Sequence, residues 1–471
     1  MNQILLERLC GVVGADHVLT DMDLGAYEED WNRRARGKAL AVVRPADTVQ
    51  TAQVIRICAD AGVGLVPQGG NTGLNLGAIP DGSGTQVVLS TKRMNAIRAI
   101  DVANLTATVE AGCVLQTLQE AARAHNLLFP LSLAAEGSCT IGGNLATNAG
   151  GTQVLRYGNA RELCLGIECV TAAGEVWNGL TALRKDNTGY DLRNLMVGSE
   201  GTLAIITAAT LRLYPLPRTQ TTAWVALPGI HEALRLLQRA QSILGPSLSG
   251  FEIIGREPVE QVGRHFAELA RPCGDSSTPW FVLMDVWNNL DDGRAREEVE
   301  SLLAGALESG EAHDAVIATS QAQSAKLWRI RESIPEAQAR DGLNIKHDIS
   351  VPVSALPDFV MELQSVLAAA VPGARFMTFG HMGDGNLHYN LQAPFGADAD
   401  AFRARYERQV NGLVYEHVAR FGGSFSAEHG IGSHKVEQLA SSKSPTALWM
   451  MRGVKQALDP RGILNPGKVL G

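Results

Sequence analysis

The 471-residue chain lacks paired cysteines, long apolar runs and an excess of positive charge. Its seven cysteines are scattered without any CxxC pair, which argues against an iron–sulfur cluster and favours reduced thiols packed as small hydrophobic groups. No apolar segment approaches the roughly 20 residues of a membrane span, and polar or charged residues interrupt the apolar positions at the N-terminus. We therefore expect a cytoplasmic protein without a transmembrane segment.

A basic surface of the kind that binds nucleic acid is also missing. The net charge is -8, with 49 acidic and 41 basic residues interspersed along the chain. Hydrophobic residues make up 45% of the sequence and no low-complexity tract occurs, so we expect a globular protein of several domains. Its partners are then small molecules or proteins rather than nucleic acids.

Neither of the common nucleotide-binding fingerprints is present. No GxGxxG joins a strand to a helix and no Walker sequence occurs, so NAD is poorly supported as a bound cofactor. Instead, glycines cluster at residues 67–73, 137–151 and 198–202, beside Asn, Ser or Thr. Such loops expose backbone N–H groups and let a pyrophosphate approach closely, although a single cluster could be an ordinary turn. Three clusters favour a nucleotide cofactor held by loops.

The N-terminal part of the chain alternates strands with helices. Residues 40–44 predict a strand, and Asp47 predicts the N-cap of a helix that ends at Gly62. Further strands are expected at 63–66, 87–89 and 106–110, with a helix at 114–125. The first two glycine clusters therefore follow regular elements rather than filling one long loop.

A pair of histidines flanks a turn signal in His381-Met-Gly-Asp-Gly-Asn-Leu-His388. A two-residue turn at Asp384-Gly385 would place His381 directly opposite His388, with Cβ atoms about 5 Å apart. Glu428, among small residues, is the candidate third ligand. Two histidines and a carboxylate suit zinc, or manganese, with positions left open for a substrate. The alternative is that the histidines merely cap a turn.

Seven motifs in chain order carry a resemblance to a known family. They are residues 67–73 (PQGGNTG), 142–151, 156–158 (RYG), 198–203 (GSEGTL), 380–388 (GHMGDGNLH), 426–430 (SAEHG) and 458–468 (LDPRGILNPGK). Together they resemble the FAD-linked 2-hydroxy-acid dehydrogenases of the vanillyl-alcohol-oxidase superfamily, and within them the D-2-hydroxyglutarate dehydrogenases. The resemblance covers nearly the whole chain.

The resemblance implies an α+β fold: a two-lobed FAD-binding domain of the vanillyl-alcohol-oxidase or p-cresol methylhydroxylase (PCMH) type, with an inserted α+β substrate-binding domain. The expected domains are 1–215 for FAD, 216–410 for substrate, and 411–471 as a C-terminal segment that returns to the FAD domain and completes the active site. Two prolines in Tyr214-Pro-Leu-Pro217 support the first boundary. Asn71 stands where relatives with covalent flavin carry histidine, so FAD is expected to be non-covalent.

The same resemblance implies which residues contact FAD. They are Gln68, Gly69, Gly70, Asn71, Thr72, Gly73, Gly137, Ser138, Gly142, Gly143, Asn144, Asn148, Gly150, Tyr157, Gly201, Ile206 and Asn465. Tyr157 and Asn465 have turn structure as an alternative interpretation.

For substrate, the resemblance implies that Arg331, Lys346 and Asn390 contact carboxylate groups, and an Arg fork with a Lys charge suits a dicarboxylate. His429, whose residue type titrates near neutral pH, is the expected catalytic base and a substrate contact. Its alternative is a supporting role beside the metal ligand. Pro335 departs from the hydroxyglutarate pattern, which has Thr there, so D-malate and D-lactate stay open as substrates.

These observations predict FAD- and metal-dependent oxidation of a D-2-hydroxy acid, with D-2-hydroxyglutarate as the first candidate. D-lactate dehydrogenase and a glycolate-oxidase flavin subunit are alternatives within the family, and an NADPH-dependent flavin reductase or a non-catalytic flavin subunit are alternatives of another class. The absence of an iron–sulfur motif means that electrons must leave through a partner or a diffusible acceptor, and the family expectation is the electron-transferring flavoprotein or a quinone. A homodimer is a further possibility.

Overall fold

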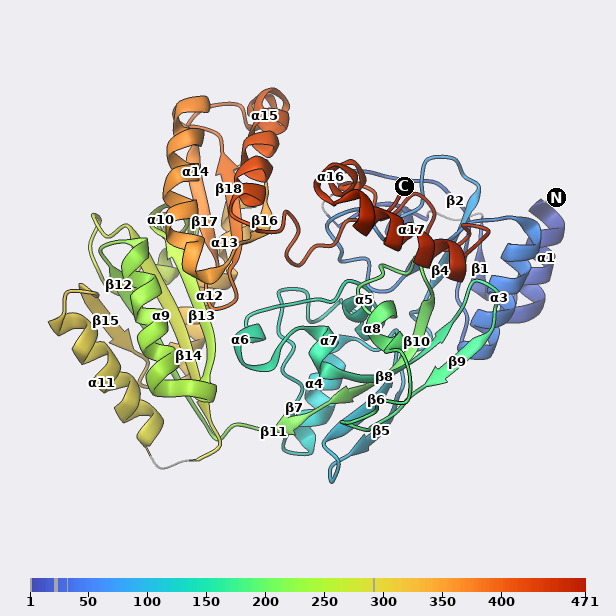
Figure 1. Cartoon of the computed structure of the whole chain (residues 1–471), viewed down its shortest axis with the longest axis horizontal. Coiled ribbons are helices and arrows are strands. Elements are labelled where there is room, and N and C mark those ends of the chain that lie inside the picture. Colours follow the sequence, from blue (N-terminus) through green and yellow to red (C-terminus); the bar gives the residue numbers. More distant parts are fainter. Residues whose placement is uncertain (1, 21–23, 32, 291–292) are drawn as a thin grey trace. The chain divides into compact units, whose positions relative to one another are not determined.

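The computed structural model describes residues 2–20, 24–31, 33–290 and 293–471, which form two compact units (Figure 1). The first unit contains Met1–Gly150, Gly158–Leu216 and Glu428–Gly471, and the second contains Gly151–Tyr157 and Pro217–Ala427. The division between Leu216 and Pro217 lies one residue beyond the predicted boundary at 215. The predicted boundary at 410 falls inside one continuous helix, α15 (Ala399–Arg420), so the chain leaves the second unit only after that helix.

The first unit is built on two main sheets. One has the order β1 (Val18–Leu19), β2 (Ala39–Val43), β4 (Gln86–Ser90), β3 (Leu65–Gln68); the other has the order β5 (Ile97–Asp101), β6 (Thr106–Glu110), β10 (Ile205–Arg212), β8 (Cys164–Val170), β9 (Val176–Gly179). A short pair joins β7 (Leu127–Leu128) to β11 (Tyr214–Pro215). The helices are α1 (Asn2–Val13), α2 (Gly25–Glu28), α3 (Thr48–Ala61), α4 (Leu115–Ala124), α5 (Ile141–Ala146), α7 (Ala160–Leu163), α8 (Leu192–Met196), α16 (Val436–Ser442) and α17 (Pro445–Leu458).

Local sequence signals account for the elements around the first glycine cluster. The Asp47 side chain accepts a hydrogen bond from the Gln50 N–H, and α3 ends at Gly62 with a left-handed φ of 66°. Both predicted caps are therefore confirmed. The strand at 106–110 is confirmed as β6, whereas the strand predicted at 63–66 begins two residues later, at Leu65 in β3. The shift places the end of β3 at Gln68, immediately before the glycine cluster.

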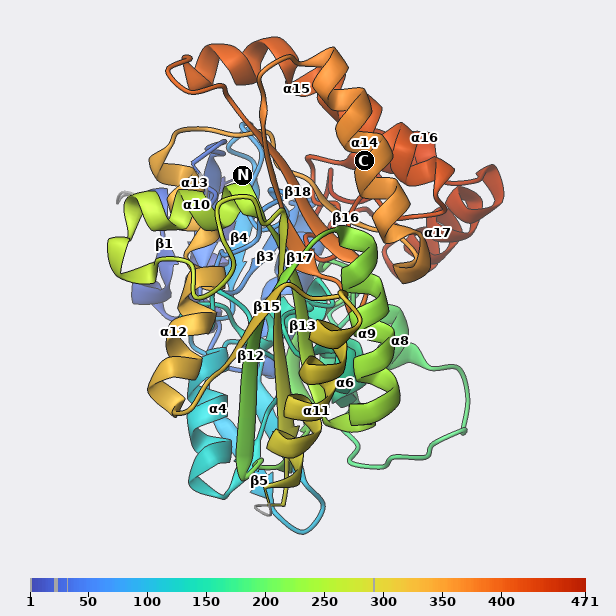
Figure 2. The same ribbon diagram turned by 90° about the vertical axis from the view of Figure 1, so that its left-hand side faces the viewer.

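The second unit is one seven-stranded sheet with helices on both faces. Its order is β15 (Asp314–Ile317), β12 (Thr219–Leu227), β14 (Trp280–Asn288), β13 (Leu248–Gly255), β17 (Arg375–His381), β18 (Asn386–Gln392), β16 (Asp348–Ser350). Figure 2 shows α9 (Ile230–Leu244), α11 (Arg294–Glu308) and α14 (Leu356–Ala370) on one side, and α10 (Arg256–His265), α12 (Gln321–Glu332) and α13 (Ile334–Arg340) on the other. Each helix group packs in its own apolar core against the sheet. A short helix, α6 (Val154–Tyr157), contacts β13.

One helical stretch in the described part of the chain, Val353–Ala370, is long and apolar enough to cross a membrane by composition, with a mean hydropathy of 1.2. Most of it is α14, whose Phe359, Val360, Leu363 and Leu367 pack into the core of the second unit. A core helix passes the same test, so this stretch is weak evidence for a membrane span.

A polar cluster at the end of α13 yields a first prediction. Asp341 accepts hydrogen bonds from Arg375 at 2.8 Å and Gln261 at 2.6 Å, and lies 2.5 Å from His265 Nε2. Glu257 faces the same Arg375 at 3.5 Å. Burial raises the pKa of Asp341, but its three partners outweigh burial and lower the pKa to about 2. Since an unfolded Asp titrates near pH ~3.9, the ionised carboxylate stabilises the folded state above that pH.

Replacing Asp341 with asparagine is expected to lower the free energy of unfolding at pH 7 by about 1–2 kcal/mol, allowing for partial solvent screening. The difference from wild type should shrink as the pH falls through the unfolded pKa toward about 2, where the native carboxylate also becomes protonated. Urea unfolding at pH 7 and pH 3 measures it, with Asp358→Asn, an exposed position on α14, as the control. An equal loss at both pH values would contradict the role of the charge.

Candidate active site

The histidine pair lies on one face of the hairpin formed by β17 and β18, but not in the predicted register. His381 pairs with Asn386, and His388 pairs with Phe379, so a four-residue loop at 382–385 replaces the predicted two-residue turn. The prediction that His381 stands directly opposite His388 is therefore wrong. The two histidines are diagonal neighbours on the same face, and their ring centroids are 5.6 Å apart.

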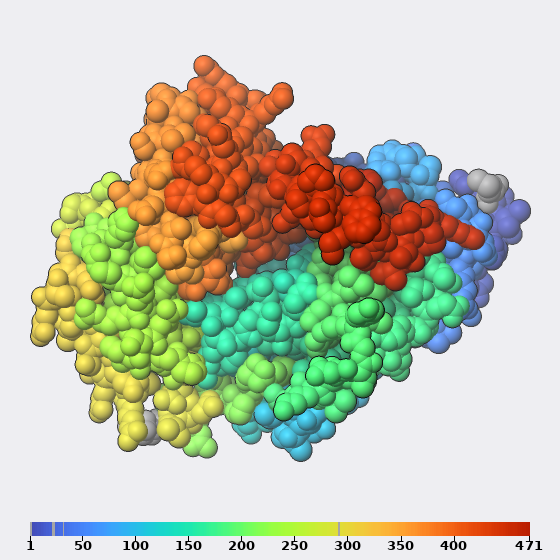
Figure 3. Space-filling view, in the orientation of Figure 1, coloured from blue at the N-terminus to red at the C-terminus, as the bar shows by residue number. Residues whose placement is uncertain are grey.

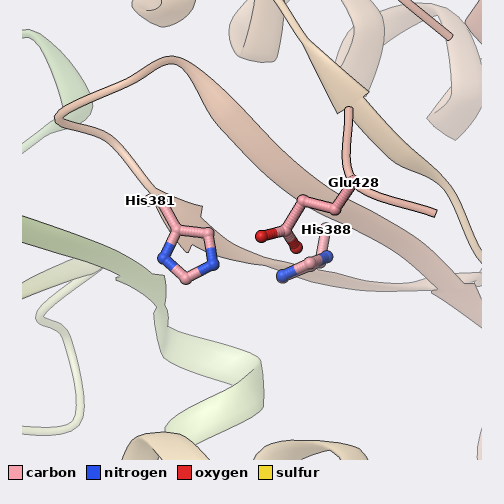
Figure 4. A group of neighbouring side chains, drawn as sticks. All are labelled: His381, His388 and Glu428. Atoms are coloured by element: carbon pink, nitrogen blue, oxygen red, sulfur yellow. The ribbon is translucent and has the colours of Figure 1, made fainter. Parts of the chain in front are cut away.

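A carboxylate completes a three-residue cluster with these rings. One potential ligand atom from each of His381, His388 and Glu428 lies within 4.8 Å of the others. Figure 4 shows the Glu428 carboxylate pointing toward both imidazoles. His381 is buried, and His388 and Glu428 are partly buried. Two imidazole nitrogens and a carboxylate oxygen fit a divalent zinc or manganese ion with open positions.

Glu428 reaches this place because the preceding segment follows the edge of the sheet. Ser424 forms a bridge with Ser350, and the Ala427 N–H donates to the Asp348 carbonyl at 3.3 Å. Glu428 comes next in the chain. A second group of potential ligands, Asp348, Glu428 and His429, also lies within 4.8 Å, so the expected base is adjacent to the expected metal ligand. The backbone contacts of Ser424 and Ala427 with β16 therefore position the whole 426–430 motif.

Two acidic residues near the cluster were not predicted. Asp348 is the cross-strand partner of His388, and its carboxylate lies 4.0 Å from His388 Nδ1. Glu252, on β13, lies 2.5 Å from His381 Nδ1 and accepts a 2.7 Å hydrogen bond from Arg331 Nε. Burial raises the pKa of Glu252, but its contacts with His381 and Arg331 outweigh burial and lower it to about 2. The signal for Glu252 was available: it is the one charged residue in the apolar run 248–255.

The predicted substrate residues fall into different environments. Arg331 is buried, with its guanidinium 4.7 Å from the Phe379 ring centroid, and Nε is its one nitrogen that bonds another described residue. Lys346 is exposed. Asn390 is buried and accepts from the His347 N–H at 3.0 Å while donating to Gln338 at 3.0 Å, so it also links β18 to α13 and to the segment before β16. Pro335 is exposed in the first turn of α13, where its missing N–H is tolerated.

In the first unit, two glycine clusters touch each other. A Cβ on Gly69 would clash with Thr140 Oγ1, and one on Gly70 would clash with the Ser138 carbonyl, both far inside 3.0 Å. Nearby side chains carry buried oxygens without a hydrogen-bond partner among the described residues: Gln68 Oε1, Thr140 Oγ1 and Asn465 Oδ1. Glycine backbone lets a nucleotide cofactor approach closely, and the unsatisfied polar atoms beside it can form hydrogen bonds with that cofactor. The predicted cradle therefore fits FAD.

The other predicted cofactor residues are distributed as follows. Asn71 and Asn148 have left-handed φ of 56° and 50°, and Asn144 is buried in α5. Gly142 abuts Ala111, Gly201 abuts Pro67, and Gly150 abuts the Glu428 carboxylate, while Ile206 is buried in β10. Thr72, Gly73, Gly137 and Gly143 are loop or helix-start residues of the same clusters. Tyr157 belongs to the second unit, whereas the other residues of the set belong to the first.

The C-terminal segment is fastened to the first unit by a glutamate that was not singled out. Glu200 accepts from the Ile431 and Gly432 N–H groups, each at 2.7 Å, and burial raises its pKa. Lys455 of α17 donates to the Thr202 carbonyl at 2.8 Å. Residues 436–458, red in Figure 3, form surface helices, and Trp449 is 73% exposed. Residues 198–203 (GSEGTL) therefore form a glycine turn and also hold the C-terminal segment in place.

Two family models match the chain. The model for "FAD linked oxidases, C-terminal domain" matches residues 216–469, and the model for an FAD binding domain matches residues 39–179. The predicted FAD cofactor is thereby confirmed for this chain. The first model spans the cluster of histidines and Glu428, and the second spans the two glycine clusters that touch each other.

Several curated proteins are similar over most of the chain. A mitochondrial D-2-hydroxyglutarate dehydrogenase of Bos taurus is 40% identical over 96% of this chain and 81% of its own length. The D-2-hydroxyglutarate dehydrogenase of Xanthomonas citri pv. viticola is 40% identical over 95% and 92%, and that of Stutzerimonas stutzeri 35% over 99% and 98%.

Two solved structures show the fold. A substrate-bound p-cresol methylhydroxylase has a TM-score of 0.76 at 17% identity, covering 99% of this chain and 96% of its own. An alkyldihydroxyacetonephosphate synthase has a TM-score of 0.75 at 15% identity, covering 98% and 85%. The predicted fold class, α+β with a PCMH-type FAD-binding domain, is confirmed.

Proposed function

The chain belongs to the FAD-linked oxidase family, together with the D-2-hydroxyglutarate dehydrogenases, and we propose that it oxidises D-2-hydroxyglutarate to 2-oxoglutarate. The observation that supports this most directly is the cluster of His381, His388 and Glu428, linked through Glu252 to the buried Arg331. A site for a Lewis acid and a site for a carboxylate are then adjacent, as a 2-hydroxy acid requires.

Each of the two units has its own proposed task. The first unit binds FAD non-covalently through the clusters at 67–73 and 137–151, because Asn71 offers no nucleophile for a covalent link. The second unit, with Glu428 directly after it, binds the hydroxy acid and a zinc or manganese ion. When bound, FAD supplies a hydride acceptor and the divalent ion supplies a Lewis acid that lowers the pKa of the substrate hydroxyl.

The protein's residues then have three roles in this proposal. Arg331 presents its two terminal nitrogens to a substrate carboxylate, since Nε is held by Glu252. Lys346, exposed beside the strand that carries Asn390, adds a second positive charge. His429 accepts the hydroxyl proton on an imidazole nitrogen, and Asp348 and Glu428 lie beside it to orient the ring.

The proposed function also includes the length of the substrate, the electron acceptor, the assembly and the location in the cell. Pro335 offers no side-chain hydroxyl to the far end of a dicarboxylate, so D-malate and D-lactate are tested as shorter substrates. The electron-transferring flavoprotein or a quinone is the proposed acceptor, and the homodimer the proposed assembly. We propose the cytoplasm as the location; the mitochondrial designation of the cattle relative makes cell fractionation the deciding measurement.

Anaerobic titration of the FAD-loaded chain is the direct test. D-2-hydroxyglutarate is expected to bleach the flavin absorbance, whereas its L-enantiomer is not, and removal of the metal with a chelator is expected to abolish bleaching until zinc or manganese is restored. The flavin absorbance near 450 nm is followed after each addition over a period on the order of seconds to minutes.

Each other outcome contradicts a different part of the proposal. Bleaching by D-malate or D-lactate alone would replace the substrate. Bleaching by NADPH alone would indicate a flavin reductase, and a flavin that no donor reduces would indicate a non-catalytic subunit. Full bleaching of the chelator-treated protein would remove the metal from the mechanism.

A further inference from the structure

Glu252 occupies an unusual position for a carboxylate. It lies in β13, between two neighbouring strands of the sheet, and its side chain is wholly buried. Strand β13 pairs with β17 so that Glu252 stands opposite His381. A charge removed from water in this way is costly unless it is paired and hydrogen-bonded, and Glu252 has a partner for each of its oxygens.

The first partner fixes an imidazole. Glu252 Oε1 lies 2.5 Å from His381 Nδ1. A ring that donates its Nδ1–H to a carboxylate presents its unprotonated Nε2 outward, which is the form that binds a divalent ion. Rotation of the ring would break this hydrogen bond, so Glu252 determines both the tautomer and the orientation of His381.

The second partner fixes a guanidinium. Glu252 Oε2 accepts a 2.7 Å hydrogen bond from Arg331 Nε, and Arg331 Cζ lies over the Phe379 ring, 4.7 Å from its centroid. Because Nε is bonded to Glu252, the group has its two terminal nitrogens left to present to a ligand. That is the edge that forms a two-point contact with a carboxylate.

We propose that Glu252 is a positioning residue that holds His381 and Arg331 together, so that the affinity for the divalent ion and the affinity for the substrate carboxylate depend on one buried side chain. This inference rests on the proposed function, which supplies both ligands. Glu252 touches neither the ion nor the acid and acts through the two side chains that do.

The matched test compares two carboxylate-to-amide changes in neighbouring strands. Glu252→Gln removes the charge between His381 and Arg331. Asp285→Asn changes another buried carboxyl group, on β14, which accepts from Thr222, Gln220 and Trp287, and none of these partners belongs to the cluster of His381, His388 and Glu428. Zinc affinity is measured by competition with a chromophoric chelator on the FAD-loaded protein, and KM and kcat are measured for the hydroxy acid. Urea unfolding provides the stability of each variant.

Glu252→Gln is expected to weaken zinc binding by about 10–100-fold and to raise KM by about 10-fold or more, whereas Asp285→Asn loses stability with a zinc affinity close to wild type. Glu252→Asp keeps the charge but is one methylene shorter, so it should give intermediate values; it also provides the readout if Glu252→Gln does not fold. Equal effects of the two amide variants on zinc affinity, or an unchanged affinity in Glu252→Gln and Glu252→Asp, would overturn the inference. Wild-type protein that binds neither zinc nor manganese would instead refute the metal site of the proposed function.

Discussion

Replacing His388 with alanine is expected to lower kcat/KM for the 2-hydroxy acid by at least about 10³-fold, because Lewis-acid stabilisation of the transition state is worth several kcal/mol. The variant removes one of the two proposed nitrogen ligands and leaves His381 and Glu428 as an incomplete set. Stopped-flow reduction of the flavin and metal analysis of the purified protein measure the effect. The zinc content should fall in proportion to the activity.

The control for this prediction is His313→Ala, an exposed histidine of the same unit, which should retain activity and metal. His388 also packs 4.9 Å from the Phe379 ring, so a urea unfolding curve separates a ligand effect from a packing effect. Adding zinc should restore chelator-treated wild type but not His388→Ala. A variant that keeps its activity with a full complement of zinc would show that the ion is held by other residues.

From the sequence, the residues that form this cluster were predicted better than the way their strands pair. The observed register differs from the predicted one by two residues, and a shift of two keeps His381 and His388 on the same face, whereas a shift of one would have separated them. The register itself was predicted wrongly, because Asp384-Gly385 is only the second half of a four-residue loop. In that loop the Asp384 side chain accepts a hydrogen bond from the Asn386 N–H at 3.1 Å. This local hydrogen bond competes with a two-residue turn, and the Asp-Gly dipeptide alone does not reveal it.

Residues that reach the cluster from distant strands lay beyond prediction from local pattern. Glu252 and His381 are 129 positions apart, and they meet only because β13 pairs with β17. Asp348 meets His388 through the pairing of β16 with β18. Neither pairing has a local signal, whereas the caps of α3 and the strand at 106–110 depend on adjacent residues and were confirmed. A lone acid in an apolar strand indicates a buried partner without identifying it.

Replacing Gly70 with alanine is expected to weaken FAD binding by about 10–100-fold, the largest effect anticipated in the first unit. A Cβ there would collide with the Ser138 carbonyl and approach its carbonyl carbon to 2.9 Å and Cys139 Cα to 3.0 Å. All of these are backbone atoms, so no side-chain rotation can relieve the clash, and the two glycine clusters must separate. Flavin content after purification and fluorescence titration of the apoprotein with FAD measure the result.

Two other alanine variants show whether backbone contact is the cause. Gly69→Ala meets the Thr140 side chain, which can rotate, so it should weaken FAD binding less than Gly70→Ala does. Gly11→Ala, in α1 with no atom within 4 Å of the new Cβ, should leave flavin content unchanged. Strain of about 1–3 kcal/mol should also appear in the unfolding of Gly70→Ala apoprotein. If that loss of stability occurs while the affinity for FAD stays at the wild-type value, the contact between the clusters is only packing, and the residues that hold FAD must lie elsewhere in the first unit.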